Sequence, residues 1–192
     1  MLNYPFEVCY RMMVDKLLIW SFKRGSREAL RRIYDKYHRE MLKLAIILAG
    51  EPNVAEDIVH DVFCTFAQSA DRITLAGSLK GYLITSTVNR IRNYQRDKNR
   101  RAQLGLNEAD MMSSTERRPE QWAILSEQLE HLTNAVAGLP YEQREVIMLR
   151  IQCDMTFRKI AHWQKTSVST VQGRYRYGIE KLRSFLDGEL PK

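Results

Sequence analysis

The stretch Met155–Arg183 reads MTFRKIAHWQKTSVSTVQGRYRYGIEKLR and predicts two short helices joined by a tight turn. Thr156 is a good N-cap for the first helix, and Ser167 is one for the second. The small side chain of Ala161 lets two helices cross closely. The second helix then carries an apolar stripe at steps of three and four: Val168, Val171, Tyr175, Ile179, Leu182 and Leu186.

The other face of this second helix is polar and basic. Such side chains hydrogen-bond base edges and phosphates, and a helix fits the major groove of duplex DNA. The plain alternative is an amphipathic helix with a solvated basic face. The turn, the crossing Ala161 and the stripe together favour DNA binding. The candidate DNA contacts are Ser169, Thr170, Gln172, Arg174 and Arg176.

The turn departs from the usual helix-turn-helix pattern at Lys165, where a left-handed glycine is common. A residue other than glycine costs about 1 kcal/mol in that conformation. Either Lys165 tolerates the strain, or the turn is reshaped with Trp163 as its apolar plug. Gly173, inside the second helix, costs about 1 kcal/mol relative to alanine and would allow a close approach to the DNA backbone.

The composition agrees with a nucleic-acid partner, because 30 Lys and Arg against 23 Asp and Glu leave a net charge of +7. Membrane surfaces and RNA would attract such a chain as well. The longest apolar run, residues 42–49, is too short to span a bilayer and no signal peptide is evident, so we expect a cytoplasmic protein without membrane insertion. The three cysteines, Cys9, Cys64 and Cys153, lack the spacing of a disulfide framework or a zinc site.

Strand signals are almost absent, so the predicted fold class is all-α. The N-terminal half predicts three helices, one after a cap at Ser26, one opened by Asn53 and Glu56 as a capping box, and one after Ser78. The second of them has an acidic face, and the third ends with amides interleaved among cations, a pattern that suits unpaired bases. Each pattern also has the plain interpretation of a solvated charged face.

Periodicity is lost over residues 102–119, which predicts a flexible linker between two small helical domains. The predicted organisation is an N-terminal extension with the start of the first helical region at 1–23, a first domain at 24–101, the linker, and a second domain at 120–192 with the helix-turn-helix. No catalytic motif, phosphate loop or metal-ligand spacing is present, so we expect no enzyme, metal or cofactor. A stand-alone helix-turn-helix regulator is the alternative function, but neither a dimer interface nor a sensor domain is evident.

Several strings in this order resemble the extracytoplasmic-function group of bacterial sigma-70 factors. AEDIVHDVF at Ala55–Phe63, SLKGYL at Ser78–Leu83 and the Asn-x-x-x-Asn-Tyr that starts at Asn89 resemble region two. LPYEQREVIMLR at Leu139–Arg150 and the helix-turn-helix after it resemble region four. The resemblance spans nearly everything from residue 24 to residue 186, whereas residues 1–11 match nothing in the family, and a biological start at Met12 or Met13 is the alternative.

The resemblance implies a factor that binds core RNA polymerase and directs it to promoter DNA, in many members under the control of an anti-sigma factor. It implies polymerase contacts at Glu56, Asp57, Asp61 and Phe63, minus-ten contacts at Asn89, Arg92, Asn93 and Arg96, and minus-thirty-five contacts at the five residues of the second helix. Lys159 replaces a usual acidic residue, and Gln172 with Gly173 replaces a common Lys-Ser. The promoter sequence therefore does not follow from the resemblance.

Overall fold

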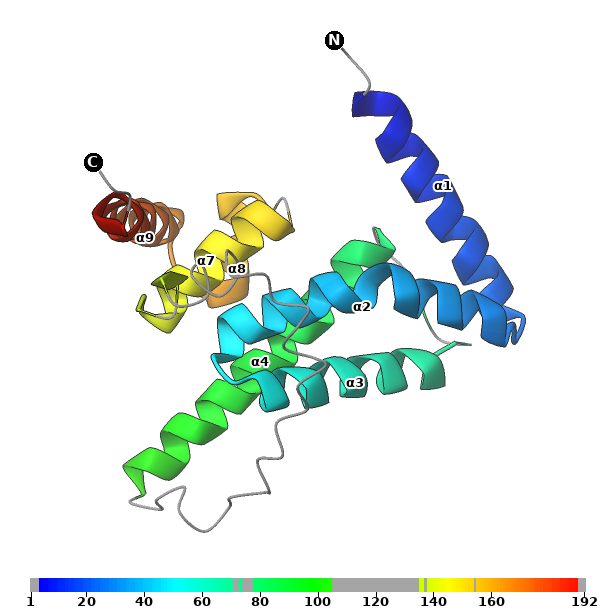
Figure 1. Ribbon diagram of the computed structural model, residues 1–192, viewed down its shortest axis with the longest axis horizontal. Helices are drawn as coiled ribbons and strands as arrows, with labels where there is room; N and C mark the ends of the chain where they lie inside the picture. Colours follow the sequence, from blue (N-terminus) through cyan, green and yellow to red (C-terminus); the bar gives the residue numbers. More distant parts are fainter. Residues whose placement is uncertain are drawn as a thin grey trace. The chain divides into compact units, whose positions relative to one another are not determined.

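The computed structural model describes residues 4–70, 73, 78–104, 135–136, 138–153 and 155–189, with side chains between Met13 and Phe185. These residues form helices and no strand, which confirms the all-α prediction for the described part of the chain (Figure 1). The helices are α1 (Tyr4–Lys23), α2 (Arg27–Ala49), α3 (Pro52–Gln68), α4 (Leu79–Gln103), α7 (Tyr141–Gln152), α8 (Phe157–Gln164) and α9 (Val168–Glu189).

The chain divides into two compact units, one of residues 1–46 and 51–91 and one of residues 47–50 and 92–192. The linker predicted at 102–119 begins inside α4, which continues to Gln103. The rest of that segment, and residues 120–134 of the predicted second domain, lie outside the described residues.

Aromatic side chains hold the first unit together. The ring of Phe22 in α1 stacks on Phe66 in α3 with centroids 4.8 Å apart, and Phe66 in turn meets Tyr82 of α4 at 6.1 Å. Tyr34 of α2 packs on Phe63 of α3 at 4.7 Å. The rings of Phe22, Phe63 and Phe66 are buried in the core, whereas Tyr34 is 37% exposed and Tyr82 is half-buried, so these two rings pack at its edge.

The described residues of the first unit form four helices, where the sequence predicted three. The additional helix is α1, which has apolar residues on both of its sides, so the amphipathic period that marks a surface helix is blurred. The start of α3 also differs from the prediction. Glu51 is its N-cap without a side-chain cap bond, and Pro52 follows, so the capping box at Asn53 is wrong. A proline at the first helical position replaces it because its missing N–H is not needed there.

The second unit is built on α7, α8 and α9, which pack against one another. Val146 and Leu149 of α7, Ile160 of α8 and Val171 of α9 are fully buried. Gly178 lies where α9 meets α7, and a Cβ placed on it would lie 2.7 Å from Cδ1 of Ile147. The absence of a side chain there sets how closely the two helices approach.

Candidate nucleic-acid interface

The turn between α8 and α9 has the geometry of a helix-turn-helix. Thr156 caps α8 by accepting from the backbone N–H of Lys159 at 3.3 Å. Lys165 ends α8 in the left-handed conformation, with φ 51° and ψ 46°, and its N–H donates to the carbonyls of Ala161 and His162. The position that prefers glycine is therefore occupied by a strained lysine, and the reshaped turn is wrong. Ile160 and Ala161 are buried as predicted.

The start of α9 is fixed by Ser167, whose Oγ accepts from the N–H of Thr170 at 3.0 Å. The same hydroxyl lies 2.8 Å from the hydroxyls of both Ser169 and Thr170. These contacts confirm the predicted cap and orient two of the candidate DNA contacts.

The exposed face of α9 is formed by Ser169, Gln172 and Arg176, which are three and four residues apart. Gly173 lies beside them and leaves space, since a Cβ placed on it would meet only the ring of Tyr177, at 4.0 Å. The guanidinium of Arg176 stacks over the ring of Tyr177 at 4.9 Å. This face offers two polar side chains and one cation.

Two residues of α9, Arg174 and Val168, do not lie where the sequence pattern placed them. Arg174 is half-buried on the flank of the helix, where its Nη1 donates to Oε1 of Gln164 in α8 at 2.7 Å. Val168 is 39% exposed, so the buried stripe begins at Val171 and includes Gly178, which the sequence pattern did not reveal. The five candidate contacts therefore do not share a single face.

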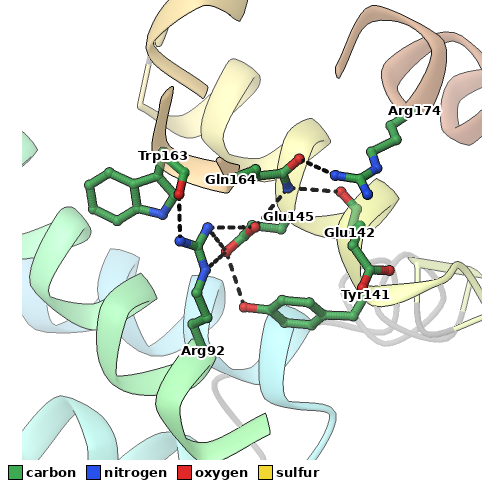
Figure 2. Close-up of polar contacts among 7 residues, drawn as sticks. All are labelled: Arg92, Tyr141, Glu142, Glu145, Trp163, Gln164 and Arg174. Atoms are coloured by element: carbon green, nitrogen blue, oxygen red, sulfur yellow. Dashed lines mark hydrogen bonds and ion pairs between the residues drawn. The ribbon is translucent and has the colours of Figure 1, made fainter. Parts of the chain in front are cut away.

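The candidate minus-ten residues lie along one face of α4 at spacings of three and four: Asn89, Arg92, Asn93 and Arg96. Three of them are exposed, whereas Arg92 is half-buried. In the second unit, Figure 2 shows Arg92 held by Glu145 of α7. Its Nη2 donates to both carboxylate oxygens at 2.8 Å, and its Nε donates to Oε1 at 3.1 Å.

Further contacts fix this ion pair. Nη1 of Arg92 donates to the carbonyl of Trp163 at 2.9 Å, and the guanidinium lies over the Trp163 ring at 5.4 Å. Glu145 is only 2% exposed, and it also accepts from Gln164 at 2.7 Å and from the hydroxyl of Tyr141 at 3.2 Å (Figure 2). Burial, and then the negative charge of Glu145, raise the pKa of Tyr141, which stays a neutral donor.

Sequence reasoning missed Glu145. The available signal was its position four residues before Leu149, which puts a carboxylate on the buried stripe of α7. A buried carboxylate requires a cation or several donors. Its partner is 53 residues away in the sequence, and no local pattern identifies it.

A groove of about 650 Å³ in the second unit adjoins the ion pair. Five cations line it against the two carboxylates of Glu142 and Glu145, so its lining is electropositive. The cations are Arg92, Arg96, Arg100, Lys165 and Arg174.

The candidate polymerase contacts lie on α3, where Asp57 and Asp61 are exposed and Glu56 is half-buried. Asp61 pairs with Nη1 of Arg90 at 3.0 Å. Phe63 differs from these residues because it is only 6% exposed and packs on Tyr34 of α2. It therefore anchors α3 to the core and is not itself exposed to a partner.

Among the described residues, no group of three His, Cys, Asp or Glu side chains is arranged to hold a metal ion. No helix of the described chain combines the length and apolar character that crossing a membrane requires.

Two family models match the chain. Sigma-70 region 2 matches residues 33–101, and Sigma-70, region 4 matches residues 135–184, so together they cover more than half of the sequence. The first match includes the acidic face of α3 and the Asn and Arg face of α4. The second includes Glu145 and the helix-turn-helix.

Similar proteins and structures agree with these matches. The ECF RNA polymerase sigma factor SigK of Mycobacterium ulcerans is 23% identical over 175 residues, covering 88% of this chain and 92% of the relative. SigW of Bacillus subtilis is 25% identical over 182 residues, covering 91% and 97%. The structure of CnrH in complex with the cytosolic domain of CnrY has a TM-score of 0.60 at 19% identity and covers 92% of this chain and 99% of that one.

The sigma factor RpoE of Bartonella quintana, solved in complex with the anti-sigma factor NepR, also has a TM-score of 0.60, at 22% identity, and covers 83% of this chain and 98% of that one. At such identities the solved structures show the fold, while the two regions in their order show the family. The chain therefore belongs to the extracytoplasmic-function group of the sigma-70 family of RNA polymerase sigma factors.

Proposed function

We propose that the chain binds core RNA polymerase through the acidic face of α3 and directs it to promoters through the exposed faces of α4 and α9. The observation that carries this proposal is the order of the two sigma-70 regions, each with a polar or charged helix face where the resemblance expects one. In this proposal residues 24–101 act as region two, 102–119 as the linker and 120–192 as region four. A stand-alone regulator is less well supported because it would leave the region 2 match without a role.

The polymerase contact rests on Glu56, Asp57 and Asp61, whose charges suit a basic partner surface and would steer the encounter. Asp57 is exposed and Asp61 already has a partner in Arg90, so Asp57 is the side chain best placed to meet a new cation. Phe63 keeps the helix in position from the core.

Promoter opening rests on Asn89, Asn93 and Arg96, exposed on the face of α4. Amides can bond the edge of a base that leaves the stack, and arginines can hold its phosphates. Flipping a base costs a few kcal/mol, which these contacts would offset. Arg92 joins them only if it exchanges the carboxylate of Glu145 for a phosphate.

Duplex recognition rests on the exposed face of α9, with Ser169, Gln172 and Arg176 toward the major groove. Thr170 and Arg174 on the flank suit phosphate contacts better than base contacts, because they lie off the centre of that face. The chain needs no catalytic group of its own in this role, and it works in the cytoplasm, where the polymerase and the promoters are.

An anti-sigma factor is a further proposed partner. RpoE and CnrH were solved with NepR and CnrY respectively, and the present chain has the same fold as those two proteins. The cations along the groove of the second unit would suit an acidic segment of such a partner.

In vitro transcription from a genomic fragment library, with core RNA polymerase and with or without the protein, tests the function directly. New start sites preceded by a shared two-part motif are the expected result. If the protein alone retards specific duplexes and adds no transcripts, the stand-alone regulator replaces this proposal.

Charge-matched variants then test the surfaces. Asp57→Lys should abolish polymerase binding, whereas Glu28→Lys, with the same charge change at an exposed position of α2, should preserve it. Asn93→Ala should bind polymerase normally but open promoters poorly. Loss of polymerase binding in Asn93→Ala would contradict the minus-ten assignment.

A further inference from the structure

The outer side of α1, the first helix in Figure 1, has an apolar stripe that no described residue covers. Met13 is 61% exposed, Leu17 is 62% exposed and Trp20 is 59% exposed. Their spacings of four and three residues place them in one row along the helix. We call these three residues the outer stripe.

The opposite side of α1 anchors the helix to the first unit, so the outer stripe is not exposed by fraying. Ile19 and Phe22 are buried, and the ring of Phe22 stacks on Phe66. Asp15 is 6% exposed and accepts from Nζ of Lys36 and from the hydroxyl of Tyr37, both at 2.6 Å. The stripe therefore sits on a fixed helix and is presented in one orientation.

The border of the outer stripe is positively charged. Lys16, Lys23 and Arg24 are exposed, and the guanidinium of Arg24 lies over the ring of Trp20 at 4.6 Å. Asp15 is the one acidic residue between Met13 and Arg27, and its carboxylate is buried and already paired. An incoming surface thus meets apolar side chains flanked by cations.

We propose that the outer stripe is a docking site for an amphipathic helix of another protein, with an apolar seam flanked by acidic side chains. The alternation of four and three is the spacing of a helix that packs along another helix. Acidic flanks on the partner would complement Lys16 and Lys23.

Two other occupants fit this surface less well. A second copy of the chain would bring the lysines and Arg24 of two stripes together, and such like-charge contacts oppose association. The cations would attract an anionic membrane, but a membrane surface favours a broad apolar face, whereas the outer stripe is a single row of three apolar side chains. The outer stripe has no part in the proposed roles of α3, α4 and α9, so its docking role stands or falls separately from the proposed function.

Fluorescence anisotropy on the full chain tests the proposal with labelled synthetic peptides. The probe is a helical peptide of four heptads with Leu at the seam and Glu at the flanking positions. One control peptide scrambles the same composition, and a second replaces each Glu by Lys. We expect binding of the acidic probe and about tenfold weaker binding of both controls.

Variants locate the site. Leu17→Asp and the milder Leu17→Gln should each weaken binding of the acidic probe about tenfold or more, with unchanged thermal unfolding because Leu17 is exposed. Ile151→Asp, at another exposed apolar position in α7, should bind like the parent chain. Lys16→Glu should weaken the acidic probe and strengthen the lysine probe.

Three results would overturn the proposal. The first is equal binding of the acidic and scrambled peptides, or binding that Leu17→Asp leaves intact. The second is concentration-dependent dimerisation in sedimentation that Leu17→Asp abolishes, since a second copy would then be the occupant. The third is binding to vesicles of anionic phospholipid that depends on Leu17, because the surface would then serve a membrane.

Discussion

Nη2 of Arg92 in α4 donates to both carboxylate oxygens of Glu145 in α7, and Glu145 is buried in the second unit. Arg92 is also one of the residues that the resemblance assigns to promoter contacts. One guanidinium cannot bind the carboxylate and a phosphate with the same donors. The promoter contact proposed for Arg92 would therefore compete with its ion pair to Glu145, and this competition can be measured.

Glu145→Gln should free Arg92 for nucleic acid. We expect the free protein to bind duplex DNA several-fold more tightly, with the slope of log K against log salt steeper by about 1, because one more cation reaches a phosphate. The same variant should lower the free energy of unfolding by about 1–3 kcal/mol, since charge-assisted hydrogen bonds are lost in a buried position. Filter binding at several salt concentrations and thermal unfolding measure the two effects.

Glu142→Gln is the matched control, because it removes the same charge from the same helix at an exposed position. It should leave the salt slope and the stability close to those of the parent chain. If both variants gain the same DNA affinity, the gain comes from net charge and not from the release of Arg92.

Lys165→Gly should stabilise the protein by about 1 kcal/mol, because Lys165 holds φ at 51°, where an ordinary side chain is strained. Lys165→Asn, which tolerates this conformation, should give a smaller gain. Lys159→Gly, inside α8, should instead destabilise the protein by a similar amount. Urea unfolding of the three variants measures these differences in the free energy of unfolding. A loss of stability in Lys165→Gly would show that the contacts of the lysine side chain contribute more to stability than its backbone strain costs.

Local features of the fold could be predicted from the sequence. Ser26, Ser78, Thr156 and Ser167 all accept a backbone N–H near the start of a helix, as predicted, because a cap involves residues only two or three positions apart. Polar and charged faces of α4 and α9 could also be identified from their periodicity. The structure shows that most of the candidate residues on these two faces are exposed, and their roles in binding stay predictions.

Features that depend on tertiary contacts could not be predicted. The helix α1 was missed because it has apolar residues on its exposed side as well as on its buried side, so the sequence does not show the one-sided apolar pattern of a surface helix. Glu145 was missed because its partner Arg92 is distant in the sequence. The sequence pattern grouped Arg174 with the candidate DNA contacts. In the structure Arg174 lies on the flank of α9 and donates to Gln164, a contact between two helices that the pattern of one helix does not reveal.

The stability of the first unit should fall as the pH drops below about 6.5 because of His38. Burial lowers the pKa of its imidazole, which lies against Tyr34 at 4.5 Å, and the nearby Asp35 only partly opposes this effect. Between the ordinary pKa of 6.5 and the lower folded value, the unfolded chain binds a proton that the folded chain does not. Stability is therefore complete above pH 6.5 and is lost as the pH falls through the folded pKa.

Thermal unfolding measured from pH 7.5 to pH 5 checks the effect of His38, because this pH range spans the ordinary histidine pKa of about 6.5. His38→Gln should flatten the dependence, whereas His162→Gln, at an exposed position in α8, should retain it. An unchanged pH profile in His38→Gln would assign the dependence to another group.

Gly173→Ala and Gly178→Ala should have different effects although both lie inside α9. A Cβ at Gly173 meets open space apart from Tyr177 at 4.0 Å, so the variant should gain about 1 kcal/mol of helix stability. A Cβ at Gly178 would lie 2.7 Å from Cδ1 of Ile147, a buried side chain that must move, so this variant should gain less or lose stability.

Ile147→Val removes the Cδ1 atom that obstructs the new Cβ, so it should cost Gly178→Ala less stability than it costs the parent chain, in which it only removes a buried methyl group. A double-mutant cycle in urea measures this coupling, which should be favourable by about 0.5 kcal/mol or more for side chains in contact. Gly173→Ala combined with Ile147→Val should be additive, since these positions are not in contact. Additivity in both pairs would mean that the approach of α7 and α9 does not depend on the absence of a side chain at Gly178.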